Sequence, residues 1–94
     1  MVRSKLKTYF DTLKAVESSD GKPTHIIREA NIEGTRGYKI LRELKDLGLI
    51  TAQEVTDDRR SKVRYEITLS GSKAIRYVAE GLKLFGLHKN NNRN

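Results

Sequence analysis

The spacing of the apolar residues changes twice along this 94-residue chain, and this change constrains the fold more than any other feature. Up to about residue 47, apolar residues recur every three or four positions, which is the period of an amphipathic helix. Between residues 49 and 69 they alternate with polar residues, as in a half-buried strand. The helical period then returns. The chain is therefore expected to place a β-hairpin among helices, in a mainly α fold of the α+β class.

Breakers and caps give the expected boundaries of these elements. Gly21 and Pro23 separate the first two helices, and Pro23 or Thr24 starts the second. Gly48 suits the left-handed position that ends a helix, and Ser70 is expected to cap the last one. The expected order is α-α-α-β-β-α. The elements are helices over residues 4–18, 24–30, 35–47 and 70–85, and strands over 49–55 and 63–69 around a polar turn, 56–61.

The inward faces of these elements are the candidate core. They consist of Leu6, Phe10, Leu13 and Val16; Ile26, Ile27 and Ala30; Gly37, Ile40, Leu41, Leu44 and Leu47; and Val63, Tyr65, Ile67 and Leu69.

Composition excludes several classes of protein. The length allows one domain with a small core. Cysteine is absent, which excludes disulfides and cysteine-ligated zinc. No apolar run approaches the roughly 20 residues of a membrane helix, and the N-terminus lacks a signal-peptide stretch. We therefore expect a cytoplasmic, nucleoid-associated protein with no membrane partner.

The sequence contains no motif of an enzyme or of a ligand site. His25 and His88 have no second metal ligand at a suitable spacing. The segment 34–37 is too short and wrongly placed for a nucleotide-binding loop, and no nucleophile with a partner base is visible. We expect no catalysis, no metal, no cofactor and no small-molecule ligand.

The chain carries 19 basic and 12 acidic residues, a net charge of +7, which favours a polyanionic partner. The excess is spread over both halves of the chain. The densest cluster, Arg59, Arg60, Lys62 and Arg64, lies in the expected turn and second strand, and a second set lies on the polar side of the 35–47 helix. Such clusters are most often solvated surface, so their place in the fold decides their interpretation.

Two short helices joined by about four residues, followed by a hairpin with a charged tip, form the arrangement of a helix-turn-helix with a β-wing. A helix fits the major groove of B-DNA, and its N-terminus presents free N–H groups to phosphates. A wing with cations at its tip can reach a neighbouring phosphate row or the minor groove.

Two motifs strengthen this interpretation. Residues 41–50 follow the pattern L-x-x-L-x-x-x-G-L-I, and residues 65–71, Tyr-Glu-Ile-Thr-Leu-Ser-Gly, resemble the pattern Y-x-L-T-x-x-G. Together they resemble small archaeal winged-helix DNA-binding proteins and, more distantly, MarR-like and PadR-like regulators. The resemblance covers residues 4–85 and implies a DNA-binding fold that dimerises through its C-terminal helix. Gly37 departs from it, because such proteins usually place Val or Leu there, and Gly34 with Thr35 is expected to provide the helix cap.

Five residues on the outer face of the 35–47 helix are expected to contact DNA. Arg36 or Arg42 would read a guanine edge, and Thr35 and Lys39 would hold phosphates. Tyr38 would stack, bind a phosphate or pack on the preceding helix. The alternative is an ordinary polar helix face.

On the wing, Arg59 and Arg60 are expected to contact the DNA backbone or minor groove, with Lys62 and Arg64 beside them. Without DNA, Asp57 and Asp58 could pair with these cations, and Arg64 could simply be solvated.

The last helix is longer than a three-helix core needs, since 16 residues span about 24 Å. Part of its apolar stripe is expected to cover the core and part to pair with a second copy of the chain. The stripe consists of Ile75, Val78, Ala79, Leu82 and Phe85.

We therefore expect residues 4–85 to form a winged helix-turn-helix domain with its dimerisation helix at about 70–85, followed by a disordered tail, 86–94. The expected function is a homodimeric, sequence-specific transcriptional regulator that binds double-stranded DNA. Two alternatives stay open: a sequence-neutral architectural chromatin protein, and a winged-helix module for protein interactions.

Overall fold

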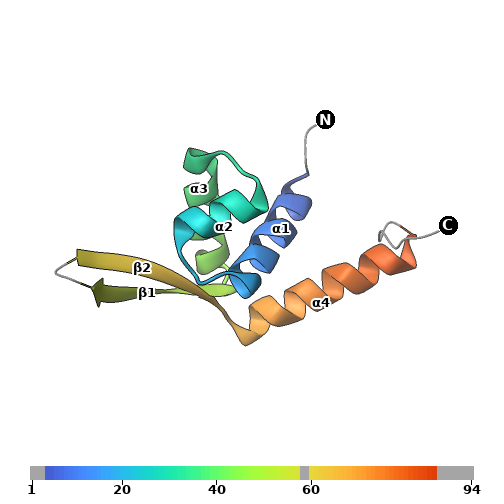
Figure 1. Cartoon of the computed structure of the whole chain (residues 1–94). Helices are drawn as coiled ribbons and strands as arrows, with labels where there is room; N and C mark the ends of the chain where they lie inside the picture. Colours follow the sequence, from blue (N-terminus) through green and yellow to red (C-terminus); the bar gives the residue numbers. More distant parts are fainter. Residues whose placement is uncertain (1–3, 58–59, 87–94) are drawn as a thin grey trace.

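The computed structural model describes residues 4–57 and 60–86, with the side chains of all but residues 57, 60 and 61. Four helices and one antiparallel hairpin follow in the expected order, which confirms the predicted fold class (Figure 1). The expected tail, 86–94, lies outside the described residues except for Gly86. The elements are α1 (Lys5–Ser18), α2 (Pro23–Ala30), α3 (Gly34–Asp46), β1 (Ile50–Asp57), β2 (Arg60–Ile67) and α4 (Leu69–Leu84).

The core lies between the first three helices and the base of the hairpin. It contains most of the predicted positions of α1, α2 and α3, together with the first residue of β1. Tyr65 and Ile67 of β2 and Ala74 and Ile75 of α4 pack against it and are partly buried. The buried cluster consists of Leu13, Ala15, Val16, Ile26, Ile27, Ala30, Ile40, Leu41, Leu44 and Ile50.

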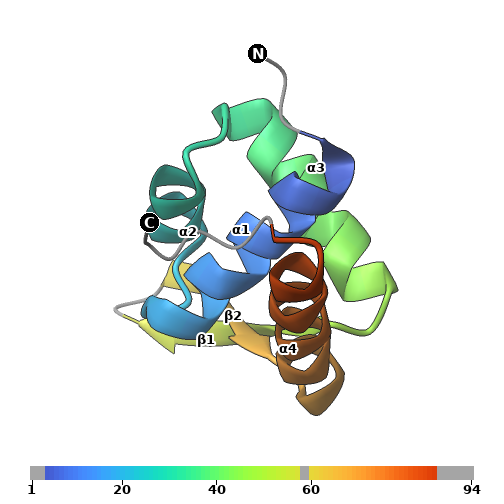
Figure 2. The same ribbon diagram turned by 90° about the vertical axis from the view of Figure 1, so that its right-hand side faces the viewer.

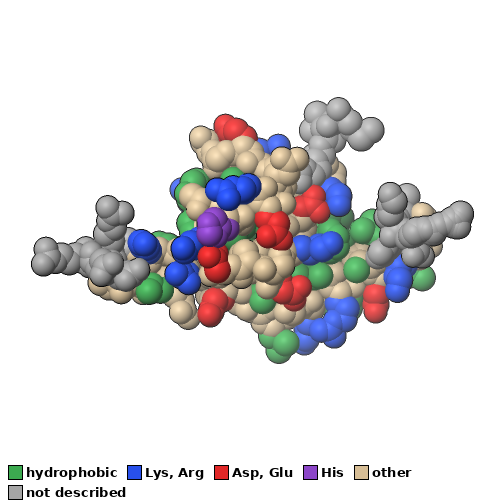
Figure 3. Space-filling model, viewed as in Figure 1, with side chains coloured by type: hydrophobic (Ala, Val, Ile, Leu, Met, Phe, Trp, Pro, Cys, Tyr) green, Lys and Arg blue, Asp and Glu red, His purple; other side chains and the backbone are tan. Residues whose placement is uncertain are grey.

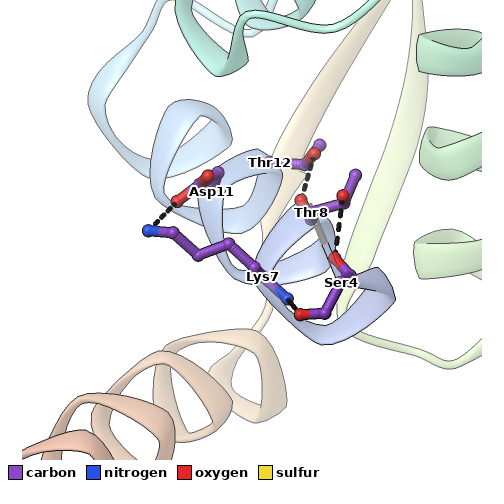
Figure 4. Close-up of polar contacts among 5 residues, drawn as sticks. All are labelled: Ser4, Lys7, Thr8, Asp11 and Thr12. Carbon is purple, nitrogen blue, oxygen red and sulfur yellow. Dashed lines mark hydrogen bonds and ion pairs between the residues drawn. The ribbon is translucent and has the colours of Figure 1, made fainter. Parts of the chain in front are cut away.

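The buried face of α1 includes two threonines and excludes a leucine that was expected to lie inside. Thr8 and Thr12 are fully buried, whereas Leu6 is 61% exposed. Each threonine hydroxyl donates to a carbonyl one turn earlier, Thr8 to Ser4 at 3.0 Å and Thr12 to Thr8 at 2.7 Å (Figure 4). These bonds remove the cost of burying a hydroxyl. The prediction of the buried face of α1 from its apolar residues was therefore wrong at these positions.

Gly37 is buried where α3 crosses α2, and this contact explains why the chain has glycine where the resembled proteins usually have Val or Leu. A Cβ atom added at Gly37 would lie 2.6 Å from Cγ1 of Ile27. Val or Leu at this position would push the two helices apart.

The caps of two helices differ from those predicted. Glu33, not Gly34 with Thr35, caps α3: its carboxylate accepts a hydrogen bond from the Arg36 backbone N–H at 3.0 Å. Thr68, not Ser70, caps α4, because its hydroxyl accepts from the Gly71 N–H at 3.0 Å.

Two residues that were predicted to belong to the core, at the end of α3 and the start of α4, are exposed. Gly48 has a φ of +78°, as expected for the residue that ends α3. Leu47, at that end, and Leu69, in the first turn of α4, are exposed, although both were expected to face inward. Both lie at helix ends, past the segments that the other elements cover.

The hairpin is longer than predicted, because cross-strand pairing continues from Ile50↔Ile67 to Asp57↔Arg60. The expected turn, 56–61, is accordingly shorter, and the second strand ends at Ile67 instead of residue 69. Successive side chains of a strand point to opposite faces, so residues two apart share one face. Tyr65 and Ile67 therefore share the face that packs on the helices, and Lys62 and Arg64 lie on the other face.

The hairpin and α4 extend from opposite sides of the helical body (Figure 1). Viewed along the direction in which α4 projects, α1 runs through the middle of the body with α2 and α3 on either side of it (Figure 2). The α3 helix therefore lies near the wing and away from the free end of α4.

Candidate nucleic-acid interface

The outer face of α3 carries the five side chains that were predicted to form a site. Thr35, Arg36, Tyr38, Lys39 and Arg42 are all exposed, while the opposite face of the helix is buried. The structure therefore brings these five residues together on one solvent-facing surface, which we call the α3 face.

Glu33, which caps α3, and Glu43, within α3, are both engaged by hydrogen bonds. Glu33 accepts the hydrogen bond of the helix cap. Glu43 accepts a hydrogen bond of 2.6 Å from the Tyr9 hydroxyl and lies 3.8 Å from the Lys5 ammonium. The Tyr9 hydrogen bond is the main cause that lowers the pKa of Glu43. Within the described part of the chain, neither Arg36 nor Arg42 forms an ion pair with a carboxylate.

Tyr65 of β2 lies within electrostatic range of two residues of the α3 face, which the sequence did not reveal. Its ring is partly buried against the core. Burial is the main cause that raises the pKa of Tyr65; nearby Tyr38 raises it further, and Arg42 opposes the rise. The alternation of β2 predicted only that Tyr65 points inward. No local signal in the sequence indicates that two residues of α3 act on its phenol electrostatically.

Lys62 and Arg64 lie on the hairpin face opposite Tyr65, because successive side chains of a strand point to opposite faces. Lys62 is exposed and Arg64 is half-buried. Figure 3 shows Lys and Arg side chains gathered on the hairpin close to the helical body. Arg59 and Asp58 lie outside the described residues, and so do the side chains of Arg60 and Asp57.

The residues of the stripe predicted for dimerisation differ in burial along α4. Ile75 packs against the core, and Val78, Ala79 and Leu82 are half-buried. Phe85, just past the end of the helix, is 81% exposed, and its neighbour Leu84 is 87% exposed. Hydrophobic side chains are also visible along α4 in Figure 3.

The described residues include no group of three potential ligands that could hold a metal ion. His25 instead faces Asp20, with its Nδ1 atom 3.1 Å from both carboxylate oxygens. None of the helices within the described ranges is both long enough and apolar enough to cross a bilayer.

A profile described as winged helix-turn-helix matches residues 2–84 of the chain. A search of curated protein sequences gives no match.

Several solved structures have a similar fold. The structure of smu.1704 from Streptococcus mutans UA159 superposes with a TM-score of 0.76 at 22% identity, covering 89% of this chain and 83% of that one. Sso10a-2, described as a DNA-binding protein from Sulfolobus solfataricus, gives a TM-score of 0.64 at 25% identity and the same coverage. The MepR protein of S. aureus, in a complex with DNA, gives 0.62 at 16% identity. That match covers 90% of this chain and 60% of MepR.

Proposed function

Since this chain belongs to the winged helix-turn-helix family, we propose that it is a transcriptional regulator that binds double-stranded DNA as a homodimer. The proposed activity is occupancy of a DNA site, without catalysis and without a cofactor. Two of the similar structures support a DNA partner, because Sso10a-2 is described as a DNA-binding protein and MepR is in a complex with DNA.

The observation that carries this proposal is the charge of the α3 face. Arg36, Lys39 and Arg42 are exposed there, while Glu43 is held by Tyr9 and Lys5 of α1. A helix with free cations on its outer face and a buried inner face is suited to lie in the major groove, where base edges and phosphates are both within reach.

Each residue of the α3 face has a proposed role. Arg36, in the first turn, reads a guanine edge, because recognition helices contact bases mainly through their N-terminal residues. Thr35 and Lys39 hold phosphates, which fix the register of the helix in the groove. Arg42, farther along the same exposed face, is the alternative residue to read a guanine edge.

The wing extends the contact beyond the groove that α3 occupies. Arg59 and Arg60, near its tip, are proposed to contact the backbone or the minor groove, with Lys62 and Arg64 adding positive charge nearer the body. Such contacts do not depend on base sequence.

The dimer is proposed to form through the free end of α4. Leu84 and Phe85 are exposed there, and burying them against a second copy would remove apolar surface from water. To bind two half-sites on successive major grooves, the two α3 helices of such a dimer would have to lie about 34 Å apart.

A titration of duplex DNA at several salt concentrations tests the proposal. We expect the logarithm of the affinity to fall linearly with the logarithm of the salt concentration, because phosphate neutralisation releases counterions. Affinity that does not depend on salt, or no binding at about 100 mM salt, contradicts a DNA-binding role and favours a protein-interaction module.

Two variants separate base reading from backbone binding. We expect Arg36→Ala to change the sequences selected from random duplexes, and Arg59→Ala with Arg60→Ala to weaken all duplexes alike. Arg76→Ala, an exposed arginine on α4, is the matched control. If the wild-type protein binds selected and random duplexes equally, the sequence-neutral architectural role replaces that of a site-specific regulator.

A further inference from the structure

The end of α3 and the start of α4 are joined by one continuous set of hydrogen bonds. At the end of α3, the Gly48 N–H donates to the Lys45 carbonyl at 2.9 Å, and the Leu49 N–H donates to the Leu44 carbonyl at 3.0 Å. This is the Schellman arrangement, with Gly48 at a φ of +78°. It fixes the direction in which the chain leaves α3.

The two carbonyls at this exit both accept hydrogen bonds from Thr68, the residue that caps α4. The Gly48 carbonyl accepts from the Thr68 hydroxyl at 2.8 Å, and the Leu49 carbonyl accepts from the Thr68 N–H at 3.1 Å. The same hydroxyl accepts from the Gly71 N–H at 3.0 Å. The exit from α3 and the entry into α4 therefore share one hydrogen-bonded unit, which we call the α3–α4 joint: Gly48, Leu49, Thr68 and Gly71.

Gly71 allows the two sides of the α3–α4 joint to pack closely. It is buried, and a Cβ atom at this position would overlap the Leu49 carbonyl oxygen and lie 2.7 Å from Cγ1 of Ile67. The Leu49 carbonyl is backbone held by Thr68, so it cannot move aside as a flexible side chain would. A larger residue at this position would therefore have to tilt or shift α4 relative to α3.

Both motifs that resemble the winged-helix pattern meet in the α3–α4 joint. Leu44, Gly48 and Leu49 belong to the L-x-x-L-x-x-x-G-L-I pattern, and Thr68 and Gly71 belong to the segment 65–71. The first motif ends α3 and the second starts α4. The hydrogen bonds between them give the two motifs one shared structural role.

The direction of α4 is decided close to the α3–α4 joint. Ala74 and Ile75 pack against the core, whereas Leu84 and Phe85 at the free end are exposed. The helix extends away from the body (Figure 1). Because 16 residues span about 24 Å, a rotation of about 10° at the joint would move the free end by about 4 Å, more than the rise of about 3.4 Å per base pair.

We propose that Gly71 is a positioning residue that sets the spacing of the DNA half-sites. Because it has no side chain, α4 packs directly on the Leu49 carbonyl, and this contact fixes the angle between α3 and α4. In a dimer that forms through the free end of α4, this angle sets the distance between the two α3 helices. The inference rests on the proposed function and adds to it the residue that determines spacing. Equal tilts in both protomers would change the α3–α3 distance by up to about 8 Å, or about two base pairs.

The α3–α3 distance can be measured without DNA. The chain has no cysteine, so Lys39→Cys on the exposed face of α3 gives one spin label per protomer. Pulsed electron paramagnetic resonance on the dimer should give one narrow distance distribution. Gly71→Ala in the same background should broaden this distribution or shift it by about 3 Å or more. The matched control is Gly81→Ala in α4, where a Cβ atom meets no atom within 4 Å, and it should change nothing.

The spacing preference is the second measurement, made with Lys39 in place. Duplexes carry two selected half-sites with one or two base pairs added or removed between them. The wild type should prefer one spacing by about tenfold or more, because a dimer that reaches only one half-site loses avidity. Gly71→Ala should lower this preference to about threefold or less, or move it to another spacing, while its affinity for a single half-site stays within about twofold of the wild type.

Thr68→Val decides the question if Gly71→Ala does not fold. This variant keeps the shape of the side chain and the N–H bond to Leu49, but it removes both contacts of the hydroxyl. It should broaden the α3–α3 distribution and weaken the spacing preference. Thr68→Ser keeps the hydroxyl and should do neither.

One set of results overturns the role of the α3–α4 joint and leaves the proposed function intact: wild-type distances and wild-type spacing preference in every folded variant of Gly71 and Thr68. A wild-type dimer that binds all spacings equally also overturns it. A wild-type protein that shows no α3–α3 distance, or that binds no duplex, contradicts the joint and the proposed function together.

Discussion

At the scale of single residues, Gly37 illustrates how packing overrides helix propensity. A glycine inside a helix costs about 1 kcal/mol relative to alanine. Here the missing side chain lets α3 approach Ile27 of α2, and this approach sets how far the α3 face projects from the body.

Replacing Gly37 by alanine should therefore lower the free energy of unfolding by about 1–3 kcal/mol, because the new methyl group would overlap the Ile27 side chain. The matched control is Gly81→Ala in α4, where a Cβ atom meets no atom within 4 Å. This control should raise the free energy of unfolding by about 0.5–1 kcal/mol. Chemical denaturation measures both. Stabilisation by both variants would show that α2 and α3 do not depend on this close contact.

The hydrogen bond from Tyr9 to Glu43 joins α1 to α3 and makes stability depend on pH. It lowers the pKa of Glu43 below its ordinary value of 4.5 and raises that of Tyr9 above 10.0. A carboxyl group whose pKa is lowered by folding stabilises the fold at pH values above its ordinary pKa. This contribution is lost as the pH falls through the lowered pKa. A tyrosine whose pKa is raised by folding stabilises the fold below pH 10.0, and this contribution is lost as the pH rises through the raised pKa.

Tyr9→Phe should accordingly lower the Tm at pH 7, and the difference from the wild type should shrink below about pH 4.5. Thermal unfolding followed by circular dichroism between pH 3 and 8 measures this. Tyr77→Phe, which removes the hydroxyl of an exposed tyrosine on α4, should leave the Tm unchanged throughout. A Tyr9→Phe deficit that is the same at pH 3 and pH 7 would rule out a link to Glu43 ionisation.

At the scale of elements, the start of α4 depends on Thr68. Its hydroxyl accepts from the Gly71 N–H and donates to the Gly48 carbonyl at 2.8 Å. Its own N–H donates to the Leu49 carbonyl at 3.1 Å. One residue thus caps α4 and ties it to the connection between α3 and β1.

Thr68→Ala should lower the free energy of unfolding by about 1–2 kcal/mol, the usual cost of removing a helix cap. Ser70→Ala, in the first turn of α4, should change it by less than about 0.5 kcal/mol. Thr68→Ser should retain most of the wild-type stability, because it keeps the hydroxyl. Equal losses from Thr68→Ala and Ser70→Ala in urea denaturation would contradict the observed cap.

At the scale of the whole molecule, the wing and α4 extend from opposite sides of the body, so a DNA surface and a dimer surface need not compete (Figure 1). Phe85→Glu places a charge at the free end of α4 and should convert the proposed dimer into a folded monomer, whose Tm no longer depends on protein concentration. The matched control is Leu69→Glu, an exposed leucine at the opposite end of α4, which should leave the dimer intact.

Analytical ultracentrifugation measures this change, and duplex titration should show weaker binding by the monomer, because the second half-site no longer adds avidity. A wild-type protein that sediments as a monomer at the concentrations at which it binds DNA would remove the dimer from the proposal.

The candidate site was predictable where its residues lie on one element. The spacing of Arg36, Lys39 and Arg42 placed all three on the polar face of one helix, and the structure leaves all three exposed. Tyr65 was not predictable as a neighbour of this face. Its approach depends on how the hairpin packs on the helices, which no short segment of the chain encodes.

The sequence by itself determined the order of the elements and most of the buried positions, because the period of apolar residues follows from local backbone geometry. Only the tertiary structure decided which apolar residues stay uncovered, such as Leu6 and Leu47, and which side chain caps each helix. It also decided that Gly37 is a packing residue and that Tyr65 lies within electrostatic range of Arg42. These features depend on distances between segments far apart in the chain, and such distances are fixed only when the whole core packs.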